Sequence, residues 1–183
     1  MPAMFHRTLV LTTLTFALSA CAIFSDDPRH RTPGVIIDDN VLEGVVEREI
    51  RKSDQGYKGS HIVVVAYNGL VLLAGQVPNE ALRTKASEVT GKLNRVRKVH
   101  NELSIGGPIS MVARTNDSWL TSKVKTRLVA SKQVDGTKIK VQTEAGVVYL
   151  MGLIHRHQAD AAVEVASQVY GIQKIVKVFE YLD

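Results

Sequence analysis

The sequence is poor in cysteine and in aromatic residues. Its 183 residues include one cysteine, and Phe, Trp and Tyr together make up 5%. A single cysteine cannot form an intramolecular disulfide, which excludes a disulfide-stapled scaffold, and it also excludes a zinc site with more than one cysteine ligand. The hydrophobic fraction of 45% and the charged fraction of 22% indicate a folded chain, with room for one domain or two small ones.

The apolar stretch near the N-terminus is too short to cross a membrane. It reads LVLTTLTFAL and has ten residues, whereas a helix needs about 20 residues to span a ~30 Å hydrocarbon core. Arg7 precedes it, and small residues follow it in Leu18-Ser19-Ala20-Cys21. This order of a basic residue, a short apolar segment and small residues is typical of an export signal.

The four residues Leu18-Ser19-Ala20-Cys21 resemble a bacterial lipobox. The resemblance implies that residues 1–20 are a removed signal peptide, and that Cys21 carries a diacylglycerol and an acyl chain such as palmitate. The alternative is an ordinary signal peptide with a coincidental cysteine. Ala22 favours sorting to the outer membrane, by resemblance to enterobacterial lipoproteins. Each buried acyl methylene contributes about 0.8 kcal/mol, so we expect a lasting anchor at Cys21. We also expect a flexible tether over 21–38.

The rest of the chain repeats itself. Asp39 and Asp117 lie 78 positions apart, and each is expected to N-cap a helix. Apolar residues then recur with helical spacing in both copies. Two predicted strands follow in each copy, and Asn68-Gly69 is a strong hairpin turn signal in the first. The matching segments are the apolar positions Leu42, Val46 and Ile50 against Leu120, Val124 and Leu128; strands 62–67 and 70–77 against 139–143 and 147–154; helices 80–93 against 157–170; and strands 96–105 against 172–182.

Each copy therefore has the predicted order αββαβ. The hairpin is antiparallel, and the second helix is a crossover that brings the last strand in parallel. We expect an α+β fold with two tandem domains, 39–106 and 117–183, joined by a linker over 107–116. Each would be a three-stranded mixed sheet packed with two helices. Because a domain this small buries only a modest core, we expect the two copies to pack on each other.

Two such units after a lipobox resemble the BON family of bacterial osmotic-shock and nodulation domains. The resemblance rests on Val71-x-Leu-x-Ala-Gly75 with Val96-x-x-Val99-x-Asn101 in the first copy, and on Val147–Gly152 with Gly171–Lys174-Ile175 in the second. Residues 117–127 are similar to dual-BON outer-membrane lipoproteins. The second copy has Lys177 where the first has Asn101, which affects a turn or an edge.

The resemblance implies a non-enzymatic, lipid-anchored protein on the periplasmic face of the outer membrane. It implies that the second unit binds an anionic phospholipid such as phosphatidylglycerol, and that the protein supports envelope integrity and associates with cell division sites. Envelope or outer-membrane-assembly proteins are further candidate partners.

One helix stripe has the chemistry for such binding. Trp119, Lys123 and Arg127 recur at i, i+4 and i+8 in the first helix of the second copy, and Lys125 extends the polar surface. Indole rings favour headgroup depth, and cations meet lipid phosphates. The first copy has Val41, Val45 and Glu49 at these positions, so the fold itself does not require the Trp and the cations. The predicted phospholipid-binding residues are Trp119, Leu120, Ser122, Lys123, Thr126 and Arg127.

Other interpretations of these stripes stay open. Trp119 is alternatively a packing residue between the units. Lys123 and Arg127 alternatively form a solvated helix face. Val41 and Val45 either bury against the second unit or contact a protein. The rival function is therefore a periplasmic adaptor that binds envelope proteins or cell wall through the first unit or a sheet edge.

The sequence offers little for catalysis, metal or nucleic acid. It has no Gly-x-Ser-x-Gly, no phosphate loop and no dinucleotide fingerprint, so we expect no catalytic residues and no cofactor besides the lipid on Cys21. His155 and His157 form the one close histidine pair, without an evident third ligand, and we expect no metal. The net charge of +5 and pI of 9.4 invite nucleic-acid binding, but export and the lack of interleaved stacking aromatics argue against it.

Overall fold

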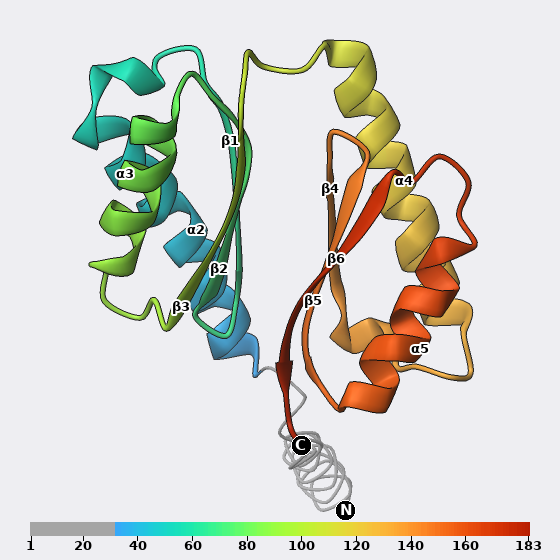
Figure 1. The fold of residues 1–183 in the computed structure, drawn as a ribbon. Helices are drawn as coiled ribbons and strands as arrows, with labels where there is room; N and C mark the ends of the chain where they lie inside the picture. The colour runs from blue at the N-terminus through green and yellow to red at the C-terminus, as the bar shows by residue number, and fades with distance from the viewer. Residues whose placement is uncertain (1–31) are drawn as a thin grey trace, which may run out of the picture. The chain divides into compact units, whose positions relative to one another are not determined.

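The computed structural model describes residues 32–183, and these form two consecutive repeats of the same five elements (Figure 1). The predicted signal peptide and Cys21 lie outside the described residues. The first repeat consists of α2 (Pro33–Ser53), β1 (His61–Tyr67), β2 (Leu70–Val77), α3 (Glu80–Gly91) and β3 (Lys98–Ile105). The second consists of α4 (Met111–Ala130), β4 (Lys140–Glu144), β5 (Val147–Ile154), α5 (Arg156–Ser167) and β6 (Lys174–Tyr181). The single turns η2 (Gln55–Tyr57) and η3 (Gly136–Lys138) follow α2 and α4.

Each repeat is a three-stranded mixed sheet with its hairpin's second strand in the middle. The strand orders are β1-β2-β3 and β4-β5-β6. The hairpin pairs are antiparallel, and the last strand runs parallel to the central one. Both helices of a repeat cover one face of its sheet, as Figure 1 shows within each repeat. The predicted αββαβ order and α+β class are confirmed.

Each sheet has one face that its helices leave uncovered. These two faces pack together in a third cluster of buried residues. Every residue of β2 is buried, because helices cover one side of this strand and the second repeat covers the other. Tyr67 Oη donates to the carbonyl of Lys138 at 2.9 Å, which links the repeats beside this cluster. The members are Val65, Tyr67, Leu70, Leu72, Ala74, Tyr149, Met151 and Val178. The two copies therefore pack on each other, as expected, and residues 31–183 form one compact unit.

Both first helices begin seven residues earlier than predicted, because their N-caps are Thr32 and Ser110 in place of Asp39 and Asp117. Thr32 caps α2 by accepting from the backbone N–H of Val35 at 3.3 Å, and Ser110 caps α4 by accepting from Ala113 at 3.2 Å. Pro33 at the first helical position suits this start, because its fixed φ is already helical. Residues 33–38 and 111–116 are therefore helical, and the predicted tether and linker are wrong over these residues.

The two aspartates predicted as caps instead hold the hairpin turns. Asp39 is buried and accepts the backbone N–H groups of Asn68 at 2.8 Å and Gly69 at 3.1 Å. Asp117 is also buried and accepts those of Ala145 and Gly146, both at 2.9 Å. Both turn residues in each pair have positive φ, which turns two adjacent N–H groups toward one carboxylate. The prediction that these aspartates are N-caps is wrong.

The first family motif requires glycine at position 75 for a steric reason. Gly75 has φ +111°, and a Cβ at this position would lie 2.1 Å from the carbonyl oxygen of His61 on the paired strand. Gly152, its counterpart, has a negative or extended φ, and a Cβ there would lie 3.0 Å from the carbonyl of Lys138. The backbones of β1 and β2 therefore approach too closely at Gly75 for any side chain.

Replacing Asp39 with Ala is expected to lower the free energy of unfolding by on the order of 3 kcal/mol, because two backbone N–H groups lose a charged acceptor. Urea unfolding followed by circular dichroism measures this. The matched control is Asp38→Ala. Asp38 pairs with Arg95 at 2.7 Å, but both side chains are more than half exposed, so its loss should cost about 1 kcal/mol or less. Equal effects of the two variants would contradict the role given to Asp39.

Candidate functional site

Five of the six residues predicted to bind phospholipid lie on the exposed side of α4. Trp119 is 49% exposed, and the other four are Ser122, Lys123, Thr126 and Arg127. Leu120 is 0% exposed and belongs to the core beneath α4 with Val124 and Leu128. Because successive helical residues are rotated by about 100°, Leu120 points inward where Trp119 points outward. The assignment of Leu120 to a lipid-binding face is wrong.

Trp119 and Lys123 form a cation–π pair on the surface of α4. The Lys123 ammonium lies 4.4 Å from the centroid of the Trp119 ring, within the range for a favourable interaction. Trp119 is not a member of the cluster shared between the repeats, so the alternative of a packing residue between the units lacks support. The pair holds an aromatic ring and a cation side by side at one exposed place.

The hydroxyl groups on this face are engaged with their own helix. Ser122 Oγ donates to the carbonyl of Ser118 at 3.0 Å, and Thr126 Oγ1 donates to the carbonyl of Ser122 at 2.8 Å. Their oxygens keep acceptor capacity, whereas their protons are already used. These residues therefore contribute a small polar surface, while Lys123 and Arg127 supply its charge.

Lys125 does not extend this surface. Its ammonium donates to the carbonyls of Gly136 at 2.9 Å and Ile139 at 2.6 Å, which belong to η3 and the residue after it. The side chain therefore ties α4 to the start of the β4–β5 hairpin. The expectation that Lys125 adds to the exposed polar face is wrong, because its position on the helix turns it toward η3.

Arg127 extends the surface from α4 to the end of α5. Its Nη1 donates to Oε1 of Gln168 at 3.3 Å, and Gln168 is the C-cap residue of α5. Both side chains are exposed. The exposed surface of the second repeat is therefore built from two elements, whereas sequence periodicity reveals only the α4 part. We call Trp119, Ser122, Lys123, Thr126 and Arg127 the α4 face.

The corresponding stripe of α2 is apolar at Val41 and Val45 and ends at Glu49. Val41 is 59% exposed and Val45 is half-buried, so Val41 is not buried against the second repeat. Ile37 lies one turn before Val41 and is 62% exposed. It was missed because residues 33–38 are assigned to the tether; its spacing of four from Val41 is the signal that could have found it.

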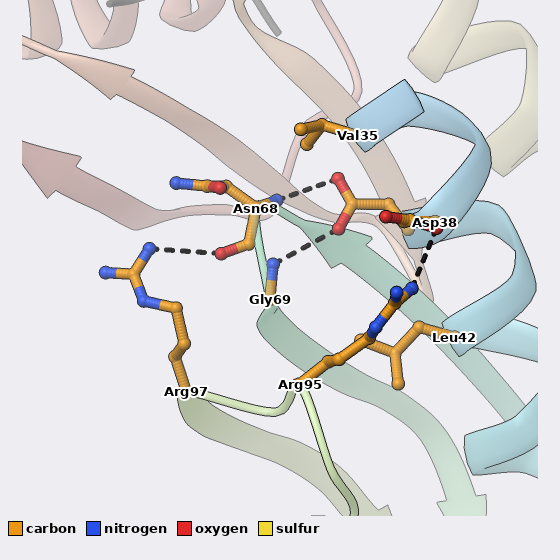
Figure 2. Close-up of a pocket in the computed structure, with 8 residues that line it drawn as sticks. Val35, Asp38, Leu42, Asn68, Gly69, Arg95 and Arg97 are labelled. Carbon is orange, nitrogen blue, oxygen red and sulfur yellow. Dashed lines mark hydrogen bonds and ion pairs between the residues drawn. The ribbon is translucent and has the colours of Figure 1, made fainter. Parts of the chain in front are cut away.

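A cavity of about 310 Å³ lies beside the start of α2 (Figure 2). It contains two arginines, and both are engaged by acidic groups. Arg95 pairs with Asp38, while Arg97 donates to the carbonyl of Asn68 and to both carboxylate oxygens of Glu180. The hydrogen bonds to Glu180 raise the pKa of Arg97 above its usual value. The cavity lining is Val35, Asp38, Asp39, Leu42, Asn68, Gly69, Arg95 and Arg97.

The second repeat has a cavity of about 270 Å³ in the same place. Gly171 and Gln173 stand there in place of Arg95 and Arg97. The cavity thus follows from the way a first helix meets its hairpin turn, and the arginines of the first copy are already paired with Asp38 and Glu180. We therefore place the candidate functional site on the α4 face.

Residues 32–183 contain neither a membrane-spanning helix nor a metal-binding cluster. No helix in this range combines the length and apolar character needed to cross a bilayer. No group of three His, Cys, Asp or Glu in the range is arranged to hold a metal ion. His155 and His157 stack on each other with ring centroids 5.6 Å apart.

Comparison with known proteins gives matches over both repeats. The BON domain family model matches residues 38–107 and 116–183. The chain is 39% identical over 165 residues to the outer membrane lipoprotein DolP of Haemophilus influenzae, covering 90% of this chain and 84% of the relative. It is 40% identical over 156 residues to the 21 kDa hemolysin of Actinobacillus pleuropneumoniae, covering 85% and 79%. It is 25% identical over 186 positions to the osmotically-inducible protein Y of Escherichia coli, covering 92% of each.

Proposed function

Because this chain belongs to the BON-domain family, with one domain in each repeat, we propose that it is an outer-membrane lipoprotein whose second BON domain binds anionic phospholipid. Its similarity to DolP over most of both chains supports an outer-membrane lipoprotein with an envelope function and not an enzyme. Support of envelope integrity and association with division sites belong to the same proposal. The observation that carries the lipid-binding part is the α4 face, which the first domain lacks.

The α4 face suits the boundary between water and lipid. An indole ring is favoured at headgroup depth, where its apolar body and its N–H are both accommodated. The cations Lys123 and Arg127 are exposed beside it and match phosphate oxygens. Each contributes about 1 kcal/mol at an anionic surface. Together they give about 2 kcal/mol, roughly a 30-fold preference for anionic over neutral lipid.

The first domain supplies the internal comparison. Its α2 positions that match Trp119, Lys123 and Arg127 are Val41, Val45 and Glu49. A carboxylate replaces a cation there, and Glu49 forms an ion pair with Lys52 at 3.1 Å. An anionic surface would repel this face or would not attract it. The same scaffold therefore supports lipid binding in one copy only.

Residues 22–183, prepared without lipid, should float with phosphatidylglycerol vesicles. Trp119→Glu, or Lys123→Glu with Arg127→Glu, should abolish flotation, and 0.5 M salt should weaken it because salt screens the phosphate attraction. Arg48→Glu on α2 is the matched control, since Arg48 is exposed on the first domain, and it should float like the unchanged protein. Undiminished flotation of the α4 variants would show that the proposed face is wrong.

The anchor is tested separately at Cys21. We expect mass spectrometry of the protein from a Gram-negative host to find diacylglycerol and a third acyl chain on an N-terminal Cys21. Cys21→Ala should lose these lipids and leave the outer-membrane fraction, whereas Trp119→Glu should keep both. Retention of Cys21→Ala in the outer membrane at the normal level would refute the anchor.

A second candidate function rests on the apolar stripe of α2. Ile37 and Val41 are both more than half exposed and lie one turn apart, which suits contact with a protein. We expect a photocrosslinker placed at Val41 to capture an envelope or outer-membrane-assembly protein in cells. A crosslinker at Arg48 on the same helix is the control. Capture of lipid alone from position 41 would remove this candidate.

A further inference from the structure

We propose that Tyr170, in the loop between α5 and β6, is a second membrane contact of the second BON domain, adjacent to the α4 face. The inference rests on the proposed phospholipid binding and adds a residue on a different element. Tyr170 is 95% exposed, more than any other large hydrophobic residue in the described part of the chain. One exposed aromatic residue is common on a protein surface, but the loop that carries Tyr170 contacts α4 at Arg127 and Leu120, so this residue adds to the aromatic and basic surface of that helix.

Two residues around Tyr170 place it beside α4. Gln168 accepts from Arg127 at 3.3 Å. On the other side, a Cβ built on Gly171 would lie 3.5 Å from Cδ2 of Leu120. The loop is therefore held against α4 at Leu120 and Arg127, on either side of Lys123, and Figure 1 shows it passing beside this helix.

The core fixes the direction of the Tyr170 side chain. Val169 is buried in the same cluster as Leu120, at 5% exposure, and Val169 N donates to the carbonyl of Ala166 at 3.0 Å. Gly171 has φ +98°, which turns the chain sharply after Tyr170. With its neighbour inside and a turn behind it, Tyr170 points to solvent.

The first domain again shows that the fold does not require this residue. Asn94 occupies the position of Tyr170, between half-buried Leu93 and Arg95, whose φ of +75° matches that of Gly171. The loop geometry is thus kept while the side chain changes from amide to phenol. Trp119 with Val41 and Tyr170 with Asn94 are two places where an aromatic is specific to the second domain, and both lie around Lys123 and Arg127.

The chemistry of this surface fits a membrane that exposes anionic headgroups. Tyrosine, like tryptophan, is favoured at the interface, where its ring meets the acyl boundary and its hydroxyl meets water or phosphate. A single helix stripe would let the domain rotate about the α4 axis. A second aromatic on a neighbouring loop, with the cations between the two, restricts that rotation and sets one orientation.

Tryptophan fluorescence can locate both contacts, because Trp119 is the single tryptophan of the chain. Residues 22–183 and two variants are mixed with phosphatidylglycerol vesicles that carry brominated acyl chains, which quench tryptophan on contact. One variant combines Trp119→Phe with Tyr170→Trp, and the control combines Trp119→Phe with Asn94→Trp. We expect quenching from positions 119 and 170 and none from position 94.

The possible outcomes separate the two proposals. Quenching at 119 without quenching at 170 would overturn the role of Tyr170 and leave the proposed lipid binding intact. No quenching at any position would overturn lipid binding itself, and with it this inference. Equal quenching at 94 would mean unspecific adsorption and would also count against both.

Substitution of Tyr170 by the residue of the first domain gives a second readout. Tyr170→Asn should lower partitioning into phosphatidylglycerol vesicles severalfold and leave the urea midpoint unchanged, because the side chain is exposed. Asn94→Tyr should change neither. Unchanged partitioning of Tyr170→Asn would refute the second contact, even where Trp119→Glu abolishes binding.

Discussion

A buried carboxylate in each domain joins the first helix to the turn of the hairpin, and the orientation of the helix depends on it. Asp117 accepts two adjacent backbone N–H groups at 2.9 Å, which leaves α4 one rotational position relative to its sheet. Leu120, Val124 and Leu128 then face the core. Trp119, two residues after Asp117, is turned to the opposite side. The surface chemistry of the domain is thus set by an interaction on its inside.

The two copies use this shared frame for different surfaces. Their cores repeat position by position, because a sheet with two helices on one face admits few arrangements of apolar side chains. Exposed positions carry no such constraint, so Val41 and Trp119, or Asn94 and Tyr170, can diverge without cost to packing. The differences between the copies therefore report on function, and the similarities report on folding.

Sequence reasoning was strongest where a turn signal and strand pattern coincide. The central strands β2 and β5 begin and end at the predicted residues 70–77 and 147–154. The predicted first helix of the first domain begins too late, because Asp39 resembles an N-cap, while the true cap is Thr32 before Pro33. Both residues satisfy local capping rules, and only the distant hairpin decides between them.

The candidate site was predictable only as far as one helix extends. Periodicity of 3.6 residues predicts the stripe of Trp119, Lys123 and Arg127. It cannot show whether the residues next to this stripe are exposed or buried. Leu120 and Lys125 flank the stripe, and their burial or hydrogen bonding depends on β4, η3 and α5. Tyr170 belongs to no periodic sequence pattern, because it lies in a loop and its position depends on tertiary contacts.

The energetics of the α4 face make sense only together with the proposed anchor. Two cations contribute about 2 kcal/mol, which is too little for a free protein to remain on a membrane at low concentration. A short tether raises the effective concentration of the domain near the surface to the millimolar range. Because α2 begins at Pro33, the eleven residues between Cys21 and Pro33 reach about 40 Å at most. At that range a weak contact is enough to orient the domain, so in the proposed function the anchor supplies the affinity, and the aromatic and basic surface supplies orientation and preference for anionic lipid.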